Sequence, residues 1–284
     1  MIRKVVFSQV DVFSQVPFQG NPLAVIFDAR DLTDQQMMDI TRWMNLSETT
    51  FVLPPENSGA DYKVRIFTPA GELPFAGHPT LGTAHALLEQ GVIEDKQGVL
   101  IQECAAGAIT IRRQPDQSLA FLAPETVITP FTSPLVDTLT GALAGQRFQP
   151  AVGGIGSRWL LLPVSSVAGL RAMALTNDEL EAVSLEANVK GLVLFAPVND
   201  DSGDDYEVRV IFSQNHSLTE DPVTGSANAC LAWYFHGYGL TRHYRARQGL
   251  SIGRHGCLTV RYEQDGIWVG GHSATLVQGE IMLP

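Results

Sequence analysis

Cysteine is scarce in this chain of 284 residues, and the three cysteines, Cys104, Cys230 and Cys257, are widely spaced. An odd number without close pairs gives neither a disulfide framework nor a zinc-binding signature. The chain also lacks an apolar run near the roughly 20 residues that span a bilayer. Its first residues do not form the apolar region of a signal peptide. These absences predict a cytoplasmic protein with reduced thiols.

Positive charge is sparse as well, because 30 Asp and Glu residues outnumber 19 Lys and Arg residues and the formal net charge is -11. Nucleic acids and anionic membranes are bound through Lys and Arg, so neither is an expected partner. A local basic stretch occurs at residues 242–254, with Arg242, His243, Arg245, Arg247 and Arg254. We interpret this stretch as a solvated loop, with phosphate binding as the weaker alternative.

Familiar motifs of cofactor and metal binding are missing. The chain has no Walker A loop, no zinc helix of the His-Glu-x-x-His type and no Gly-x-Ser-x-Gly elbow. The glycine run 153–156 lacks a clear strand before it and the later glycine of a dinucleotide fingerprint. His78 and His85 are seven residues apart, but no third metal ligand accompanies them. We therefore expect neither a cofactor nor a metal.

What the chain does contain is an ordinary globular composition and clear periodic patterns. Its length suggests about two domains. Hydrophobic periodicity predicts helices at 33–45, 79–88, 176–185 and 226–234. Thr33 and Gln36 form a capping-box pattern, and Thr176 suits an N-cap. Alternating or short apolar runs predict strands at 4–13, 24–27, 47–53, 64–68, 99–103, 108–112, 158–163, 191–196, 208–212, 258–262, 267–269 and 274–283.

Two stretches resemble copies of one motif. The strand pattern at 62–67 leads to Gly77-His78, twelve residues after Arg65, and the pattern at 206–211 leads to Gly225-Ser226, sixteen residues after Arg209. Such a repeat predicts two similar lobes. We expect the first at 1–120, with the strand at 274–284 as a possible addition, and the second at 121–273. Two facing lobes would place two helix N-termini across one cleft, which suits an anionic ligand.

Three acidic or basic residues lie at junctions between predicted elements, where catalytic residues concentrate. Glu48 lies where a helix passes into a strand, His78 lies at a helix start, and Asp221 lies in a loop five residues before Ser226. Plainer explanations exist for each. Glu48 fits a solvated carboxylate, His78 a helix cap or a half-buried histidine, and Asp221 a turn residue before Pro222.

The residues at the helix starts also have plainer explanations. Ser226 fits a helix N-cap, and Gly77 and Gly225 fit a positive φ angle or tight packing. Taken singly, these structural roles are favoured. Their mirrored placement favours an active site instead.

Proton transfer is the chemistry that these residue types offer. A buried glutamate whose pKa approaches neutrality can take a proton from a carbon and return it elsewhere. Backbone N–H groups at the two helix starts would stabilise the developing anion. This chemistry requires no redox or pyridoxal cofactor.

Several longer motifs resemble those of the phenazine-biosynthesis PhzF family of isomerases, within the diaminopimelate-epimerase-like fold. The matching segments lie at residues 10–13, 17–22, 46–51, 65–69, 72–80, 220–228, 248–249 and 253–254. They are specific, occur in the order of the family and extend over almost the whole chain.

The resemblance implies an α+β fold of two pseudo-symmetric lobes, each a curved, mostly antiparallel, barrel-like sheet around a central helix. It implies a cofactor-independent isomerase, a homodimer and a small anionic substrate; the best-known activity of the family moves a proton within a dihydro-hydroxyanthranilate ring. By the same resemblance, Glu48 would be the proton shuttle, and His78 and Asp221 would complete the acid–base set. The substrate-binding residues would be Asn21, Gly77, Gly225 and Ser226.

One departure from the wider fold separates two mechanisms. Diaminopimelate epimerases and proline racemases use a cysteine on each side of the cleft, directly before the glycine. Ala76 and Thr224 hold these places here, which disfavours two-thiol racemisation. A racemase or epimerase, and a non-catalytic binding or scaffold protein that keeps the cleft, remain the alternatives, because fold likeness does not determine the substrate.

Overall fold

The computed structural model describes residues 2–95, 97–140 and 147–283. The chain divides into two compact units. Unit 1 contains Met1–Leu122 and Gly270–Pro284, and unit 2 contains Ala123–Val269. The boundaries expected from the sequence, after residues 120 and 273, differ from these by two and four residues.

Unit 1 is built from a sheet that curves around one helix. Its elements are β1 (Arg3–Val12), β2 (Asn21–Ile26), α1 (Asp34–Met44), β3 (Glu48–Leu53), β4 (Tyr62–Thr68), β5 (Gly71–Leu73), α2 (Gly77–Glu89), β6 (Val99–Cys104), β7 (Gly107–Arg113), β8 (Leu119–Leu122) and β18 (Ser273–Leu283). Strands pair in the order β18, β1, β2, β3, β4, β6, β7 and β8, and β5 pairs with β4. Of these pairs, β2–β3 and β4–β6 are parallel and the others antiparallel.

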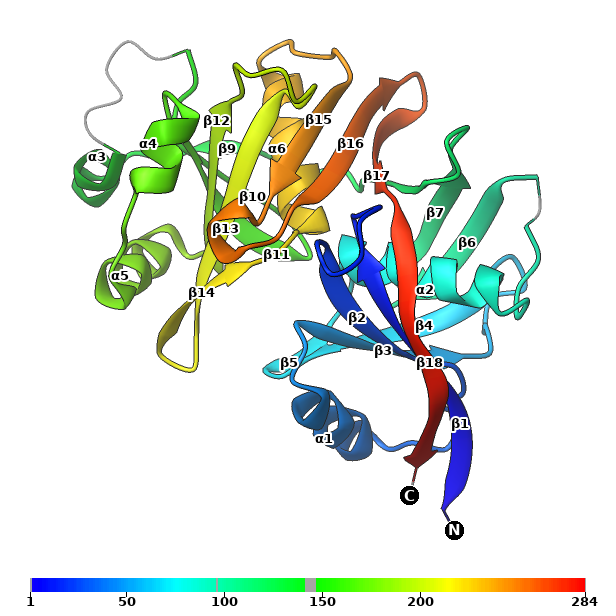
Figure 1. Cartoon of the computed structure of the whole chain (residues 1–284). Helices are drawn as coiled ribbons and strands as arrows, with labels where there is room; N and C mark the ends of the chain where they lie inside the picture. Colours follow the sequence, from blue (N-terminus) through cyan, green and yellow to red (C-terminus); the bar gives the residue numbers. More distant parts are fainter. Residues whose placement is uncertain (1, 96, 141–146, 284) are drawn as a thin grey trace. The chain divides into compact units, whose positions relative to one another are not determined.

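The helix α2 lies inside this curved sheet (Figure 1). It packs against β1, β2, β3, β6, β8 and β18, and residues on nearly every side of it are buried. A helix that is apolar all round is expected to lie inside a core. The other face of the sheet is covered by α1, where Ile26, Phe51 and Phe67 pack with Met37.

Unit 2 repeats this arrangement with additional helices. Its elements are β9 (Thr129–Pro130), α3 (Pro134–Thr140), β10 (Ala151–Ile155), β11 (Ser157–Pro163), α4 (Val167–Ala172), α5 (Asn177–Ala187), β12 (Gly191–Pro197), β13 (Tyr206–Gln214), β14 (Ser217–Asp221), α6 (Gly225–Gly237), β15 (Tyr244–Gln248), the 3-10 turn Leu250–Ile252 and β16 (Gly256–Glu263). β17 (Gly266–Gly271) crosses the boundary between the units: its residues up to Val269 belong to unit 2, and Gly270 and Gly271 belong to unit 1.

The strands of unit 2 pair in the order β9, β10, β11, β12, β13, β15 and β16, and β14 pairs with β13. The parallel pairs are β11–β12 and β13–β15. The central helix α6 packs against β10, β11 and β16. An apolar cluster that includes Leu160, Leu180, Val183 and Leu192 fills the space between the sheet and its outer helices. The predicted α+β fold class, with mostly antiparallel strands around a central helix, is confirmed.

The local signals at helix ends gave correct predictions. Thr33 and Thr176 both form complete capping boxes, with Gln36 and Glu179 as the third residues of their helices. Both helices end at an asparagine in the left-handed conformation, Asn45 in α1 and Asn188 in α5. No helix in the described part of the chain is long and apolar enough to cross a membrane.

The first two glycines of the glycine run, Gly153 and Gly154, lie inside a strand, β10, and Gly156 lies between β10 and β11. A side chain at Gly153 would place its Cβ 2.4 Å from the Cδ1 atom of Ile128 and 3.0 Å from the sulfur of Cys230. Glycine at this position therefore lets α6, which carries Cys230, pack closely on β10.

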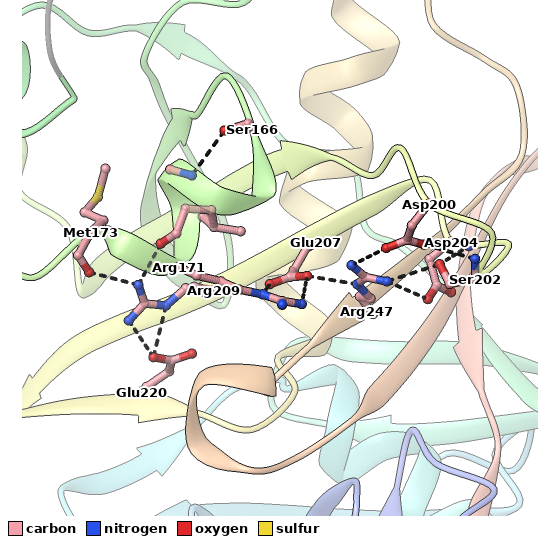
Figure 2. A network of polar contacts seen from close by, with 12 residues as sticks. Ser166, Arg171, Met173, Asp200, Ser202, Asp204, Glu207, Arg209, Glu220 and Arg247 are labelled. Atoms are coloured by element: carbon pink, nitrogen blue, oxygen red, sulfur yellow. Dashed lines mark hydrogen bonds and ion pairs between the residues drawn. The ribbon is translucent and has the colours of Figure 1, made fainter.

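The interpretation of the basic stretch as a solvated loop is wrong for Tyr244–Gln248, which forms β15. Arg247 is only 5% exposed, and it bonds to Glu207 at 2.9 Å and to Asp200 at 2.9 Å (Figure 2). Glu207 also accepts two hydrogen bonds from Arg171, at 2.6 and 2.7 Å. Because carboxylates neutralise it, a buried arginine here is a structural group and not a phosphate site.

Candidate functional site

Glu48 and His78 form a largely buried pair in unit 1. Glu48 is the first residue of β3, and His78 is the second residue of α2. The Nδ1 atom of His78 lies 3.0 Å from the Oε2 atom of Glu48, and the two side chains are 4% and 14% exposed. A carboxylate and an imidazole at this distance are within range for proton transfer.

The packing of α2 on β3 brings these two side chains together. Residues 48 and 50 of β3 point to the same face because strand side chains alternate. Thr50 on that face accepts a hydrogen bond from Thr83 of α2 at 2.9 Å. The helix and the strand are thus joined by polar contacts at two points. Neither Thr50 nor Thr83 was predicted as a site residue, since both read as ordinary helix and strand positions.

The second ring nitrogen of His78 is also buried. Within the part of the chain that the structure describes, its Nε2 atom has no hydrogen-bond partner. Buried polar atoms in native proteins almost always have a partner. The Glu48 carboxylate contacts Nδ1, so Nε2 is the ring nitrogen of His78 whose missing partner needs an explanation.

Asn21 is the first residue of β2 and is fully buried. The loop that leads to it is held by Asp11, whose Oδ2 atom accepts hydrogen bonds from the backbone N–H groups of Gln19 and Gly20, each at 3.1 Å. A side chain at Gly20 would place its Cβ 2.2 Å from the carbonyl oxygen of Val12. The loop therefore requires glycine at this position.

Asp221, Gly225 and Ser226 lie in unit 2, where Asp221 belongs to a second polar group. Asp221 is the last residue of β14 and not a loop residue as predicted. Its short strand carries Ser217, Thr219 and Glu220, so it has little apolar character in the sequence. The Oδ2 atom of Asp221 accepts a hydrogen bond from the hydroxyl group of Thr224 at 2.5 Å. Asp221 is 8% exposed, so this carboxylate is largely shielded from water.

The two central helices begin without side-chain caps. Ala76 and Thr224 are the N-cap residues of α2 and α6, and neither makes a side-chain capping bond. The outer helices α1, α4 and α5 are all capped by Thr or Ser side chains. Ser226 is not the N-cap, because it is the second residue of α6, the position that His78 has in α2. The N–H groups at these two helix starts are suited to an anionic ligand.

The cysteines are not arranged for thiol chemistry. All three are free, and burial raises the pKa of Cys104 and Cys257 and raises that of Cys230 to about 12. A reactive thiol needs the opposite shift. Among the described residues, no group of three or more His, Cys, Asp and Glu side chains is placed to hold a metal ion.

Comparison with known proteins identifies the family. A family model for phenazine biosynthesis-like proteins (PhzC-PhzF) matches residues 10–280. The chain belongs to this family. It is 35% identical to trans-2,3-dihydro-3-hydroxyanthranilate isomerase of Pseudomonas aeruginosa, over 96% of this chain and 98% of that protein. It is 31% identical to antisense-enhancing sequence 1 of Schizosaccharomyces pombe, over 96% and 97% of the two chains.

A PhzF-family protein of Bacillus anthracis has the same fold, with a TM-score of 0.84 and 22% sequence identity over 99% of this chain and 100% of that chain. Several PhzC-PhzF relatives of this chain are named as isomerases. The chain is accordingly an isomerase of the PhzC-PhzF family, and the scaffold alternative is not supported. The prediction that Asp221 works together with Glu48 and His78 stays a prediction.

Proposed function

We propose that this PhzC-PhzF protein is a cofactor-independent isomerase in which Glu48 moves a proton between two carbons of a small carboxylated substrate. The C–H bond at the first carbon breaks, and its electron pair spreads into the conjugated system of the substrate. One proton is then added to a second carbon, where the electron pair forms the new C–H bond. The reaction therefore needs no electron donor or acceptor.

The buried contact between Glu48 and His78 carries this proposal. A carboxylate that is 14% exposed can reach a ligand while most of its surface is screened from water. His78 occupies one oxygen of Glu48 at 3.0 Å. This contact orients the carboxylate toward one geometry. The Nε2 atom of His78 would bind a polar group of the same substrate.

The proposed roles of the other residues follow from their surroundings. Gly77, Gly225 and Ser226 are proposed to bind polar groups of the substrate, because the helix starts on which they lie are not capped by side chains. Asn21 would bind a further polar group. Asp221 would complete the acid–base set.

A ring with a carboxylate is the substrate class that the relatives favour. The relatives from three Pseudomonas species are named for trans-2,3-dihydro-3-hydroxyanthranilate, which makes this compound the first probe. The homodimer that the family resemblance implied stays a prediction.

The test is turnover of this probe by wild-type protein and by Glu48→Gln, which keeps the size of the side chain but cannot exchange protons. We expect the variant to lose at least about 10³-fold in kcat, since loss of general acid–base catalysis has effects of about 10² to 10⁴. Calorimetry should give nearly unchanged binding of the product.

Glu280→Gln is the matched control in the same unit, because Glu280 is a surface residue paired with Lys4. Its kcat should equal that of the wild type. Turnover by Glu48→Gln at the wild-type rate would refute the role of Glu48. Dialysis against a metal chelator should leave wild-type turnover unchanged.

A further inference from the structure

A group of buried polar side chains lies next to Asp221 in unit 2. It consists of Thr224, Asn228 and Gln248, which are buried at the start of α6 and the end of β15. Gln248 is fully buried and makes contacts with both of the others.

The hydrogen bonds of Gln248 fix the orientation of its amide. Its Nε2 group donates to the carbonyl oxygen of Asp221 and to the hydroxyl oxygen of Thr224, each at 3.0 Å. Its Oε1 atom accepts from the backbone N–H of Thr224 at 3.2 Å and from the side-chain amide of Asn228 at 3.0 Å. A flipped amide would place donors against donors, so one orientation is satisfied.

This orientation decides the direction of the next hydrogen bond. The hydroxyl oxygen of Thr224 accepts a hydrogen bond from the Gln248 amide, so the single hydroxyl proton of Thr224 points away from the amide. It points to the Oδ2 atom of Asp221, 2.5 Å away. The chain of bonds therefore runs from Gln248 through Thr224 to Asp221, and Asp221 is the acceptor at its end.

The backbone around Asp221 is held against the same strands. A side chain at Gly249 would place its Cβ 2.6 Å from the carbonyl oxygen of Pro222, and one at Gly256 would place it 1.9 Å from Val223. Gly256 pairs with Gln248 across β15 and β16. The turn between β14 and α6 is thus packed directly on the segment that presents Gln248.

We infer that Gln248 is a positioning residue, which fixes the Thr224 hydroxyl as a donor and thereby aims the Asp221 carboxylate. The inference rests on the proposed catalytic role of Asp221. Unit 1 offers the contrast. There a buried amide, Gln102, also donates to a hydroxyl of the central helix, Thr80, at 2.9 Å. The N-cap of that helix is Ala76, which has no hydroxyl to pass the contact on.

The experiment measures kcat and KM for the dihydro-hydroxyanthranilate probe in four variants. Thr224→Val removes the hydroxyl and keeps the shape, Gln248→Met removes the amide, a third variant combines both changes, and Thr224→Ser restores a hydroxyl. We expect each of the two single changes to lower kcat about 10- to 100-fold with little change in KM, since small misplacements of a catalytic group have effects of this size.

The double variant separates a relay from two independent effects. If Gln248 acts through Thr224, the second substitution adds little to the first. The double variant should then have the same kcat as the less active of the two single variants. Thr224→Ser should stay within about threefold of the wild type, because it keeps the donor to Asp221. Losses that multiply, or full activity in Thr224→Val, would overturn the inference.

Gln102→Met and Thr80→Val provide the matched control, because they remove the same kind of buried bond from unit 1. They should lower the thermal stability as much as the unit 2 variants and leave kcat within about threefold, because they remove a buried hydrogen bond of the same kind without touching Asp221. A fall in kcat equal to that of the unit 2 variants would mean that the loss is structural, and would overturn the inference.

A substrate-independent readout keeps this inference separate from the proposed function. If the wild type does not turn over the probe, the proposed substrate fails, and crystal structures of the variants decide about Gln248. The Asp221 side chain should leave its wild-type rotamer in Thr224→Val and Gln248→Met and keep it in Thr224→Ser. An unchanged rotamer in all three would refute the positioning role.

Discussion

The two units share their secondary structure and several structural contacts, but they do not share the proposed catalytic residues. The outer helices α1 and α5 each have 11 residues, a threonine capping box at the start and a left-handed asparagine at the end. In both units, the strand that follows begins three residues after this asparagine, at Glu48 in β3 and at Gly191 in β12. The scaffold is thus repeated down to single positions.

The ion pairs on the sheets show the same repetition. Arg65 of β4 binds Glu72 of β5 through two hydrogen bonds, at 2.7 and 2.6 Å. Arg209 of β13 binds Glu220 of β14 through two, at 3.1 and 2.9 Å (Figure 2). The strand registers agree, because Ile66 pairs with Leu73 and Val210 pairs with Asp221. These registers make Leu73 the counterpart of Asp221.

The proposed catalytic residues are not repeated. Glu48 pairs with Leu23 across a parallel strand pair, and Gly191 pairs with Trp159 in the same arrangement, so Gly191 is the counterpart of Glu48. A side chain at Gly191 would place its Cβ 2.3 Å from the carbonyl oxygen of Ile211. Unit 2 therefore cannot carry a carboxylate at this place. The duplication kept the frame, and each unit acquired different chemical groups on it.

The largest effect that would test this asymmetry is at the second residues of the central helices, His78 and Ser226. We expect His78→Asn to lower kcat at least about 100-fold, because the amide can keep a contact with Glu48 but cannot exchange protons as the imidazole ring does. Ser226→Ala should mainly raise KM, about tenfold, because a neutral hydrogen bond to the substrate is lost. Steady-state kinetics of both variants measures the difference. Equal effects on kcat would show that the two positions act alike.

Substitutions of the two equivalent arginines, Arg65 and Arg209, should destabilise the protein by different amounts and leave its activity unchanged. The side chain of Arg209 is 11% exposed and that of Arg65 is 23% exposed. Arg209 also donates to the carbonyl oxygens of Leu170 and Met173, at 2.8 and 3.0 Å. Breaking a buried pair by removing one partner costs about 3–5 kcal/mol, and a more exposed pair about 1 kcal/mol.

Arg209→Met should therefore destabilise the protein more than Arg65→Met. Denaturant unfolding of the two variants gives the two free energies of unfolding. An equal loss of free energy in both variants would contradict this prediction.

The smallest expected effect concerns His85 of α2. Burial lowers its pKa below the ordinary value of 6.5, so the folded state favours the neutral ring. Above pH 6.5 the ring is neutral in both states and carries no penalty. As the pH falls below 6.5, the unfolded chain binds the proton more readily, and stability falls. His85→Leu should flatten this decrease between pH 7 and pH 5, as measured by thermal unfolding; an unchanged slope would contradict the assignment.

Short-range signals allowed much of this molecule to be predicted from its sequence. The capping boxes at Thr33 and Thr176 depend on residues three positions apart, and both were predicted to begin helices. Glu48 and His78 were selected because each lies at the junction of two elements. Their contact at 3.0 Å depends on the packing of α2 against β3, which no local pattern specifies.

Strands that depend on distant partners were not predicted. β15 contains Arg245 and Arg247. Arg247 can be buried only because Glu207 and Asp200, which are 40 and 47 residues away in the sequence, neutralise it. The strand β10 contains two adjacent glycines, which have low strand propensity. Gln248 had no signal of its own except its place in a family motif, because an amide reveals its role only through its contacts.

The most direct test of the account is hydrogen exchange at the substrate carbon, followed by NMR in deuterated water. With wild-type protein, deuterium should enter the probe during turnover. With Glu48→Gln, the same C–H signal should keep its full intensity over the same period, while the variant still binds the product. Deuterium uptake by Glu48→Gln at the wild-type rate would contradict the central claim that Glu48 carries the proton.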